Sequence, residues 1–249
     1  MSRDWDASTY ERVSDPQVEW ALAVLDRLPL RGDETVLDAG CGSGRVTRLL
    51  LERLPQGRVV AVDGSPSMVQ AAREALGDRA TVILSDLLDV ELEEPVDAVF
   101  SNAVFHWITD HDRLFARLHA ALRPGGRLVA QCGGRGNIAR FIRLADEVGR
   151  QPPFAGHLSG VEEMWRFASA EETADKLESA GFVDVETSLQ EWPVERPNPR
   201  AYLSVACLGP HVERLPHDLR DPYLDEVAER AGPNPTLDYV RLNIAARRA

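Results

Sequence analysis

Apolar and polar residues alternate with two distinct periodicities between about residues 35 and 134. Short apolar runs that end in an acid or a glycine predict buried strands, and apolar positions that recur every three or four residues predict helices. We expect strands over 35–40, 57–65, 80–86, 95–108 (running into a loop) and 126–134, with helices over 44–54, 65–76 and 112–122. Because strand and helix alternate with short connections, and the strand runs are apolar on both faces, this region predicts a doubly wound, mostly parallel α/β sheet.

The pattern is less regular after residue 134. A helix and two strands are expected over 171–182, 183–194 and 237–248. The stretches 135–168 and 195–235 fit no element of the alternation, and we expect them to form helical insertions. In sheets of this class ligands bind at the carboxyl edge of the strands, so these insertions are expected to cover that edge. The core is therefore assigned to 31–134, and its remaining elements and the cover to 135–249.

Composition narrows the class of protein and its partners. The chain has 249 residues, of which 44% are apolar, and no apolar run approaches the roughly 20 residues that span a bilayer. The mixed N-terminal sequence does not resemble a signal peptide, and the three scattered cysteines form neither a disulfide framework nor a zinc pattern, so we expect a cytoplasmic protein without a metal. A net charge of -12 argues against nucleic acid or an anionic membrane as a partner.

A glycine-rich turn follows the first strand, with the sequence Asp-Ala-Gly-Cys-Gly-Ser-Gly over residues 38–44. The dinucleotide fingerprint G-x-G-x-x-G would place its third glycine at position 45, which is Arg45. Asp38, two residues before the first glycine, would repel a pyrophosphate on the helix N-terminus but would attract an ammonium group. S-adenosylmethionine (SAM) has such an ammonium group and carries no phosphate. The turn therefore favours SAM as the cofactor.

Two further acids lie where the next strands end. Asp63 follows the second strand about 20 residues after the turn, the position from which an acid binds ribose hydroxyls. Asp86 follows the third strand, where it can accept a hydrogen bond from the adenine amino group, with Leu87 against the ring.

Several motifs in the right order resemble a known family. The segments VLDAGCGSG, VVAVDGSPSMVQAA, VILSDLLD, VDAVFSNAVFHWI and LRPGGRLV are similar to those of the class I SAM-dependent methyltransferases, over roughly residues 30–132. The segments WDASTYERV and SNAVFHW resemble the branch of that family that contains the trans-aconitate 2-methyltransferases and relatives acting on small carboxylic acids. The resemblance implies a Rossmann-like fold, and an N-terminal helical segment (1–30) that folds over the site.

Together these observations give the expected cofactor contacts. The resemblance adds Asn102 and the N-terminal aromatic residues to the acids and glycines already described. The expected cofactor-binding residues are Asp38, Gly40, Gly42, Asp63, Gly64, Met68, Asp86, Leu87, Asn102, Trp5 and Tyr10.

The acceptor side is expected to use His106 and nearby residues. His106 follows the fourth strand, close to where the methyl group would emerge, and could act as a general base or hold an acceptor oxygen, with Trp107 beside it. Arg135, Arg140 and Arg143 follow the fifth strand and could bind an acidic substrate bidentately.

Three functions remain open from the sequence. We expect O-methylation of a small carboxylic acid, by a monomer or a homodimer. The alternatives are methylation of a hydroxyl- or amine-bearing metabolite with His106 as the catalytic base, and a module that binds SAM without catalysis. Other chemistries are excluded because Lys176 is the single lysine: residue 172 is Glu172, so no Tyr-x-x-x-Lys pair exists, and no Gly-Lys phosphate-binding loop is present.

Overall fold

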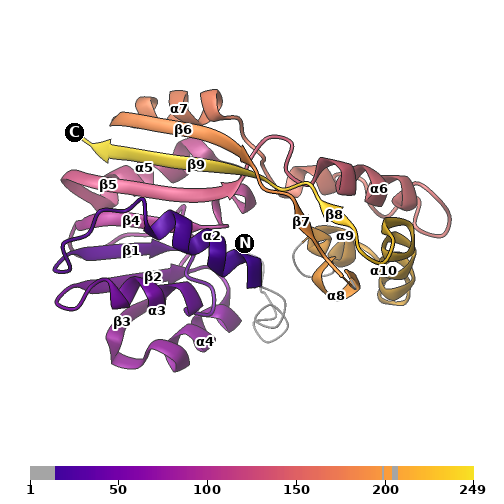
Figure 1. Cartoon of the computed structure of the whole chain (residues 1–249), viewed down its shortest axis with the longest axis horizontal. Coiled ribbons are helices and arrows are strands. Elements are labelled where there is room, and N and C mark those ends of the chain that lie inside the picture. The colour runs from indigo at the N-terminus through magenta and orange to yellow at the C-terminus, as the bar shows by residue number, and fades with distance from the viewer. Residues whose placement is uncertain (1–14, 198, 204–206) are drawn as a thin grey trace.

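The structure is a computed structural model that describes residues 15–197, 199–203 and 207–249 (Figure 1). The predicted contacts of Trp5 and Tyr10 lie outside the described residues. The sheet and the helices that pack on it form one part of the molecule, and a second group of helices lies beyond the ends of the strands (Figure 1).

A mixed sheet forms the centre of the described chain. Its strands are β1 (Thr35–Ala39), β2 (Arg58–Asp63), β3 (Ala80–Leu84), β4 (Val96–Asn102), β5 (Leu122–Gly133), β6 (Phe182–Glu191) and β9 (Val240–Arg248). The strand order is β3-β2-β1-β4-β5-β9-β6. The first five strands are parallel, and β9 runs antiparallel to both β5 and β6. The predicted doubly wound, mostly parallel sheet is confirmed.

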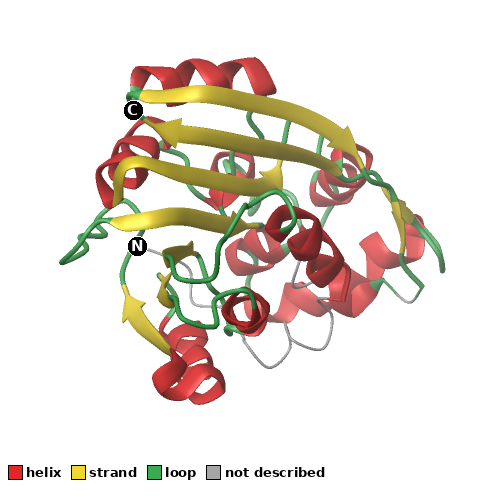
Figure 2. Ribbon diagram, turned by 60° about the vertical axis from the view of Figure 1, so that its left-hand side comes forward, coloured by secondary structure: helices red, strands yellow, loops and turns green. Residues whose placement is uncertain are grey.

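Helices cover both faces of this sheet (Figure 2). One layer contains α2 (Asp15–Leu25), α3 (Arg45–Glu52) and α4 (Pro66–Leu76), followed by η1 (Gly77–Arg79), and the other contains α5 (His111–Ala121) and α7 (Ala170–Ser179). In β4, Ala98 and Phe100 join the first layer's apolar cluster, whereas Val99 between them joins the second. Because successive strand residues point to opposite faces, burial on both faces produces the continuous apolar runs of the sequence.

The ends of two elements differ from the prediction. β5 begins at Leu122, so the segment 122–125, expected to separate the helix over 112–122 from the strand over 126–134, lies within the strand. Leu122 pairs with Val96 before a bulge in β4. The last strand is divided into β8 (Thr236–Leu237) and β9, because the chain turns where the Tyr239 N–H bonds the Leu237 carbonyl at 3.0 Å. β8 pairs instead with β7 (Val194–Glu195).

The cover lies where the sequence predicts helical insertions. Its helices are η3 (Val161–Met164), α6 (Ala139–Gly149), α8 (Arg200–Tyr202), α9 (Gly209–Arg214) and α10 (His217–Ala231). They enclose an apolar cluster of their own, which includes Phe141, Val148 and Tyr223. Within the described ranges, no helix combines the length and apolar character needed to cross a bilayer.

A narrow seam of backbone hydrogen bonds joins the cover to the sheet at the start of β9. The Gly134 N–H bonds the Val240 carbonyl, and the Ile138 N–H bonds the Asp238 carbonyl, both at 2.9 Å. The Trp192 N–H bonds the Tyr239 carbonyl at 2.8 Å on the other side of the same segment. The two points where the chain leaves the sheet, after β5 and after β6, therefore lie on either side of the segment that leads into β9.

Truncation of Phe100 tests the assignment of the buried core. It is fully buried in the central strand β4, so we expect Phe100→Ala to lower the free energy of unfolding by about 3–5 kcal/mol. Leu84→Ala is the control, because Leu84 is 49% exposed at the edge strand and its truncation should change stability by less than about 1 kcal/mol. Urea unfolding of both variants measures the difference, and equal effects would contradict the assigned core.

Candidate functional site

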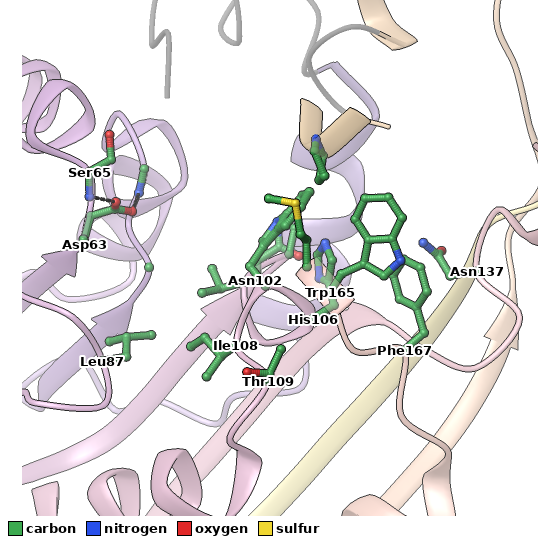
Figure 3. A pocket seen from close by; sticks show the side chains of 18 of the residues that line it. Asp63, Ser65, Leu87, Asn102, His106, Ile108, Thr109, Asn137, Trp165 and Phe167 are labelled. Carbon is green, nitrogen blue, oxygen red and sulfur yellow. Dashed lines mark hydrogen bonds between the residues drawn. The ribbon is translucent and has the colours of Figure 1, made fainter. Parts of the chain in front are cut away.

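A cavity of about 400 Å³ lies where the parallel strands end, between the core and the cover. Asp63, Ser65 and Leu87 lie at one end of it, Trp165, Phe167 and Asn137 at the other, and Asn102 and His106 between them (Figure 3). Pockets of this size at the carboxyl edge of an α/β sheet are typical ligand sites.

The glycine turn lines one wall of the cavity. The N–H groups of Gly40 and Cys41 both bond the Val62 carbonyl, at 2.8 and 3.0 Å. Gly40 has a φ of 89°, and a Cβ at this position would lie 2.2 Å from Val104 Cγ2. Residue 40 must therefore be glycine for two reasons: its φ is positive, and a side chain would collide with the loop that follows β4.

Asp63 connects the end of β2 to this turn (Figure 3). Its carboxylate accepts hydrogen bonds from the Gly42 and Ser65 N–H groups, both at 2.9 Å. Burial raises the pKa of Asp63, and these backbone hydrogen bonds oppose that shift. Gly64 and Met68 line the cavity beside it, where Ser65 caps α4 by accepting from the Met68 N–H.

Asp38 lies beneath the turn and does not line the cavity. Its side chain is 2% exposed and accepts a hydrogen bond from Thr47 Oγ1 at 2.7 Å. Burial raises the pKa of Asp38 to about 7, the Thr47 hydroxyl opposes this shift, and the charge of Asp63 adds to it. Asp38 can act on a ligand through its charge, without a direct contact.

The third and fourth strands supply the next residues. Asp86, after β3, accepts a hydrogen bond from the Leu88 N–H at 3.0 Å, and the buried Leu87 lies beside it. Asn102 ends β4, and Ala103 after it has a φ of 62° and donates its N–H to the Gln131 carbonyl at 2.7 Å. Of the predicted cofactor residues, the structure brings eight to the cavity: Gly40, Gly42, Asp63, Gly64, Met68, Asp86, Leu87 and Asn102.

His106 lies in a short helix, η2 (Phe105–Trp107), and lines the cavity with Trp107. Its Nδ1 accepts the Gly133 N–H at 3.3 Å, so the neutral ring carries its proton on Nε2. Burial, followed by the charges of Arg241 and His111, lowers the pKa of His106 well below its ordinary value. His106 is therefore a neutral imidazole that presents a hydrogen-bond donor.

The three arginines proposed for the acceptor do not reach the cavity. Arg135, Arg140 and Arg143 are exposed and lie outside its lining. Two arginines on one helical face are identified by spacing, but spacing alone does not tell which way that face points.

Arg241 in β9 occupies the cavity instead. It is 2% exposed, and its guanidinium carbon lies 4.4 Å from the centre of the Trp20 ring. Arg241 Nε donates to Gln131 Oε1 at 3.2 Å, and Gln131 Nε2 donates to Asn243 Oδ1 at 2.8 Å. The sequence analysis missed this residue, although an arginine within the apolar run YVRLNIA is a signal, because charged side chains are rarely buried without a role.

The arrangement suits a ligand with a cationic amino group at the glycine turn. Asp63 lines the cavity beside this turn and Asp38 lies beneath it, so a pyrophosphate would be repelled there. Among the described residues, no group of three His, Cys, Asp or Glu side chains is placed to hold a metal ion.

Comparison with known proteins agrees with this geometry. Residues 36–126 match the model of a methyltransferase domain family. The trans-aconitate 2-methyltransferase of Variovorax paradoxus is 31% identical over 239 residues, covering 91% of this chain and 88% of the relative. That of an Acidovorax species is 30% identical over 266 aligned positions, covering 99% of both chains.

A solved structure shows the same fold. Phosphoethanolamine N-methyltransferase 2 of Haemonchus contortus, in complex with S-adenosyl-L-methionine, superposes with a TM-score of 0.63 at 21% identity, over 97% of this chain and 56% of that one. The resemblance inferred from the sequence and the cofactor expected from the glycine turn are confirmed. The chain belongs to the class I SAM-dependent methyltransferases, in the family that contains the trans-aconitate 2-methyltransferases.

Proposed function

We propose that this methyltransferase methylates an oxygen of a small-molecule carboxylate. The observation that carries the proposal is the buried Arg241 guanidinium in the acceptor end of the cavity. Arginine binds carboxylates through fixed, charge-assisted hydrogen bonds. The relatives named trans-aconitate 2-methyltransferase support the same class of acceptor.

The core (31–134) holds the cofactor in this proposal, and the C-terminal part (135–249) completes the acceptor site. Asp63 binds the ribose hydroxyls, Asp86 and Leu87 bind the adenine, and the turn at Gly40–Gly42 approaches the amino-acid end. SAM, when bound, supplies a methyl group on a sulfonium sulfur, and the carbon–sulfur electron pair stays on sulfur as a carboxylate oxygen bonds to the methyl carbon. The products are a methyl ester and S-adenosylhomocysteine, and no proton is released.

The acceptor needs no catalytic base. Carboxylic acids titrate near pH 4, so the acceptor oxygen is already ionised at neutral pH. Arg241 holds the carboxylate and His106 Nε2–H donates to one of its oxygens, while the buried walls exclude water. A hydroxyl or amine acceptor would need a free imidazole nitrogen, but Nδ1 is engaged by Gly133 and Nε2 carries the proton. The tautomer of His106 therefore supports a carboxylate acceptor.

Loss of Asp63 is expected to weaken cofactor binding. Asp63→Ala removes hydrogen bonds to the ribose that are worth about 1.5–3 kcal/mol, or roughly 10- to 150-fold in SAM affinity by calorimetry. The exposed Asp33→Ala is the control and should bind SAM as the unmodified protein does. NAD should bind much more weakly than SAM. An unchanged SAM affinity in Asp63→Ala would contradict the ribose contact and leave Asp63 only a structural role, the hydrogen bond that holds the glycine turn at Gly42.

The affinity for SAM is expected to rise with pH between 5.5 and 7.5. The pKa of Asp38 is about 7, so its carboxylate ionises across this range and increasingly favours the cofactor's ammonium group, which titrates only near pH 8. The dissociation constant should fall on the order of tenfold in fluorescence or calorimetric titrations.

Two variants identify the titrating group. Asp38→Asn should remove the pH dependence and bind SAM weakly at every pH between 5.5 and 7.5. Thr47→Val removes a hydrogen bond that stabilises the carboxylate and should move the midpoint to higher pH. A pH dependence that persists in Asp38→Asn would assign it to another group.

The acceptor residues can be separated by kinetics. Arg241→Met should raise the activation free energy for a carboxylate acceptor by about 2–5 kcal/mol, which lowers kcat/KM roughly 30- to 5,000-fold. The reason is that the buried carboxylate of the acceptor loses its cationic partner. His106→Ala should cost only about 2- to 12-fold, the effect of one neutral hydrogen bond. A catalytic base at this position would instead cost about 10²–10⁴-fold in kcat.

Arg143→Ala is the matched arginine control, because Arg143 is exposed outside the cavity. Its kcat/KM should stay within about twofold of the unmodified enzyme, as surface substitutions usually have small effects. Thermal melting of Arg241→Met confirms that the variant is folded. A large kcat loss in His106→Ala with an unaffected Arg241→Met would contradict the proposal.

A further inference from the structure

The acceptor end of the cavity contains a buried side-chain amide. Asn137 lines the cavity and is 4% exposed. It stands at the end away from Asp63, beside the rings of Trp165 and Phe167 (Figure 3). Buried amides are usually hydrogen-bonded through both the oxygen and the nitrogen, so the partner of each atom decides what such a residue does.

The oxygen of this amide is held by the backbone. Asn137 Oδ1 accepts the Val240 N–H at 3.1 Å. A backbone N–H can only donate, so the atom that faces Val240 must be the oxygen, and this fixes which way the amide is turned. The two N–H bonds of Nδ2 therefore point away from Val240. Within the described ranges no protein group accepts from Nδ2, so this donor is presented to the cavity.

The backbone that carries Asn137 is fixed as well. The Asn137 N–H bonds the Gly134 carbonyl at 2.9 Å, which closes a tight turn after β5. On either side of Asn137, the Gly134 N–H bonds the Val240 carbonyl and the Ile138 N–H bonds the Asp238 carbonyl. A side chain that is held at its backbone and at its oxygen loses little conformational freedom when a ligand binds to its nitrogen.

Gly133 provides the space for this amide. A Cβ on Gly133 would lie 2.9 Å from Asn137 Nδ2 and 2.7 Å from Phe167 Cε1. Because the φ of Gly133 lies outside the left-handed region, the space for the amide and the ring, and not the backbone angle, requires glycine here. The Gly133 N–H bonds His106 Nδ1, so the Asn137 amide and the His106 imidazole both adjoin Gly133. Each of them presents a neutral N–H donor to the cavity.

We propose that Asn137 is a specificity-determining residue whose Nδ2–H binds a second oxygen of the acceptor. The inference rests on the proposed carboxylate methylation, in which His106 Nε2–H holds the carboxylate that receives the methyl group. It names the substrate class as a carboxylic acid with a further carbonyl or carboxylate oxygen on its body. A hydrocarbon body would leave the buried Nδ2–H without a partner, which is unfavourable. Trans-aconitate, with three carboxylates, belongs to this class.

Two acids of nearly equal shape isolate the second oxygen. 4-Oxopentanoate has a ketone oxygen where 4-methylpentanoate has a methyl group, and the carboxylate and chain length are the same. The unmodified protein is assayed with SAM by S-adenosylhomocysteine release, and the methyl ester is identified by mass spectrometry. We expect kcat/KM for 4-oxopentanoate to be at least roughly tenfold higher. The difference should lie mainly in KM, because a contact remote from the reacting atoms is made equally in the ground state and the transition state.

Asn137→Asp removes the donor but keeps the oxygen that accepts from Val240. At pH 8 the new carboxylate is ionised and repels the carboxylate of both acids, so this repulsion cancels in the ratio of the two kcat/KM values. We expect the ratio to fall from at least roughly ten to about one or below. Asn234→Asp adds the same charge at an exposed position outside the cavity lining and should leave the ratio unchanged. Thermal melting and SAM affinity establish that both variants are folded.

Ligand binding gives a measurement that does not depend on turnover. The chain has five asparagines, so labelling with ¹⁵N-asparagine produces few side-chain amide signals, and Asn137→Asp identifies those of Asn137. With S-adenosylhomocysteine bound, 4-oxopentanoate should move the Asn137 Nδ2 proton signal downfield, as a new hydrogen bond does, and 4-methylpentanoate should not. Equal shifts with both acids, or no shift with either, would contradict a bond to the second oxygen.

The outcomes separate the inference from the proposed function. Equal kcat/KM for the two acids, or a preference that persists in Asn137→Asp, overturns the inference and leaves carboxylate methylation standing. Absence of both turnover and binding with the two acids also overturns the inference. If p-cresol, which carries a hydroxyl and no carboxylate, is then methylated and trans-aconitate is not, the proposed function is overturned with it.

Discussion

The contact between Val104 and the backbone of Gly40 sets the geometry on which the site depends. It brings the loop after β4 against the turn after β1, at a spacing that admits no side chain on Gly40. Asn102 ends β4, and His106 and Trp107 belong to the loop that follows it, whereas Gly42 belongs to the turn. The cofactor end and the acceptor end therefore have a fixed separation. In a methyl transfer, where the reacting atoms must be in line, such a fixed separation is the main contribution that a protein can make.

A second constraint is the support of a buried cation by neutral polar groups. Arg241, Gln131, Asn243 and Gln190 form a chain of hydrogen bonds across β9, β5 and β6, with links of 3.2, 2.8 and 3.4 Å. The amides orient the guanidinium, and its charge lowers the pKa of His106. Such a network holds the guanidinium in one position at the cavity wall.

The sequence predicted those features that depend on local pattern. Residues buried on both faces, as around Val99 and Phe100, produce runs that identify strands, and an acid after such a run marks the strand's carboxyl end, as at Asp63. The apolar run around Arg241 marks it as a buried charge, but its place in the cavity does not follow from local pattern, because it depends on the insertion of β9 between β5 and β6, and β5 and β9 are more than 100 residues apart. The place of the exposed Arg140 outside the cavity lining does not follow from the sequence either, since helical spacing defines a face but not the neighbour that the face meets.

The seam between sheet and cover has a consequence for how the fold is divided. The chain leaves the core after Gly134 and enters its last strand at Val240, and these two residues are hydrogen-bonded to each other. Between them it returns to the core once, for α7 and β6, and β6 pairs with β9. The cover is therefore built from two separate inserts. An exchange of cover between relatives that spares the sheet has to replace each insert by itself and keep α7 and β6 in place.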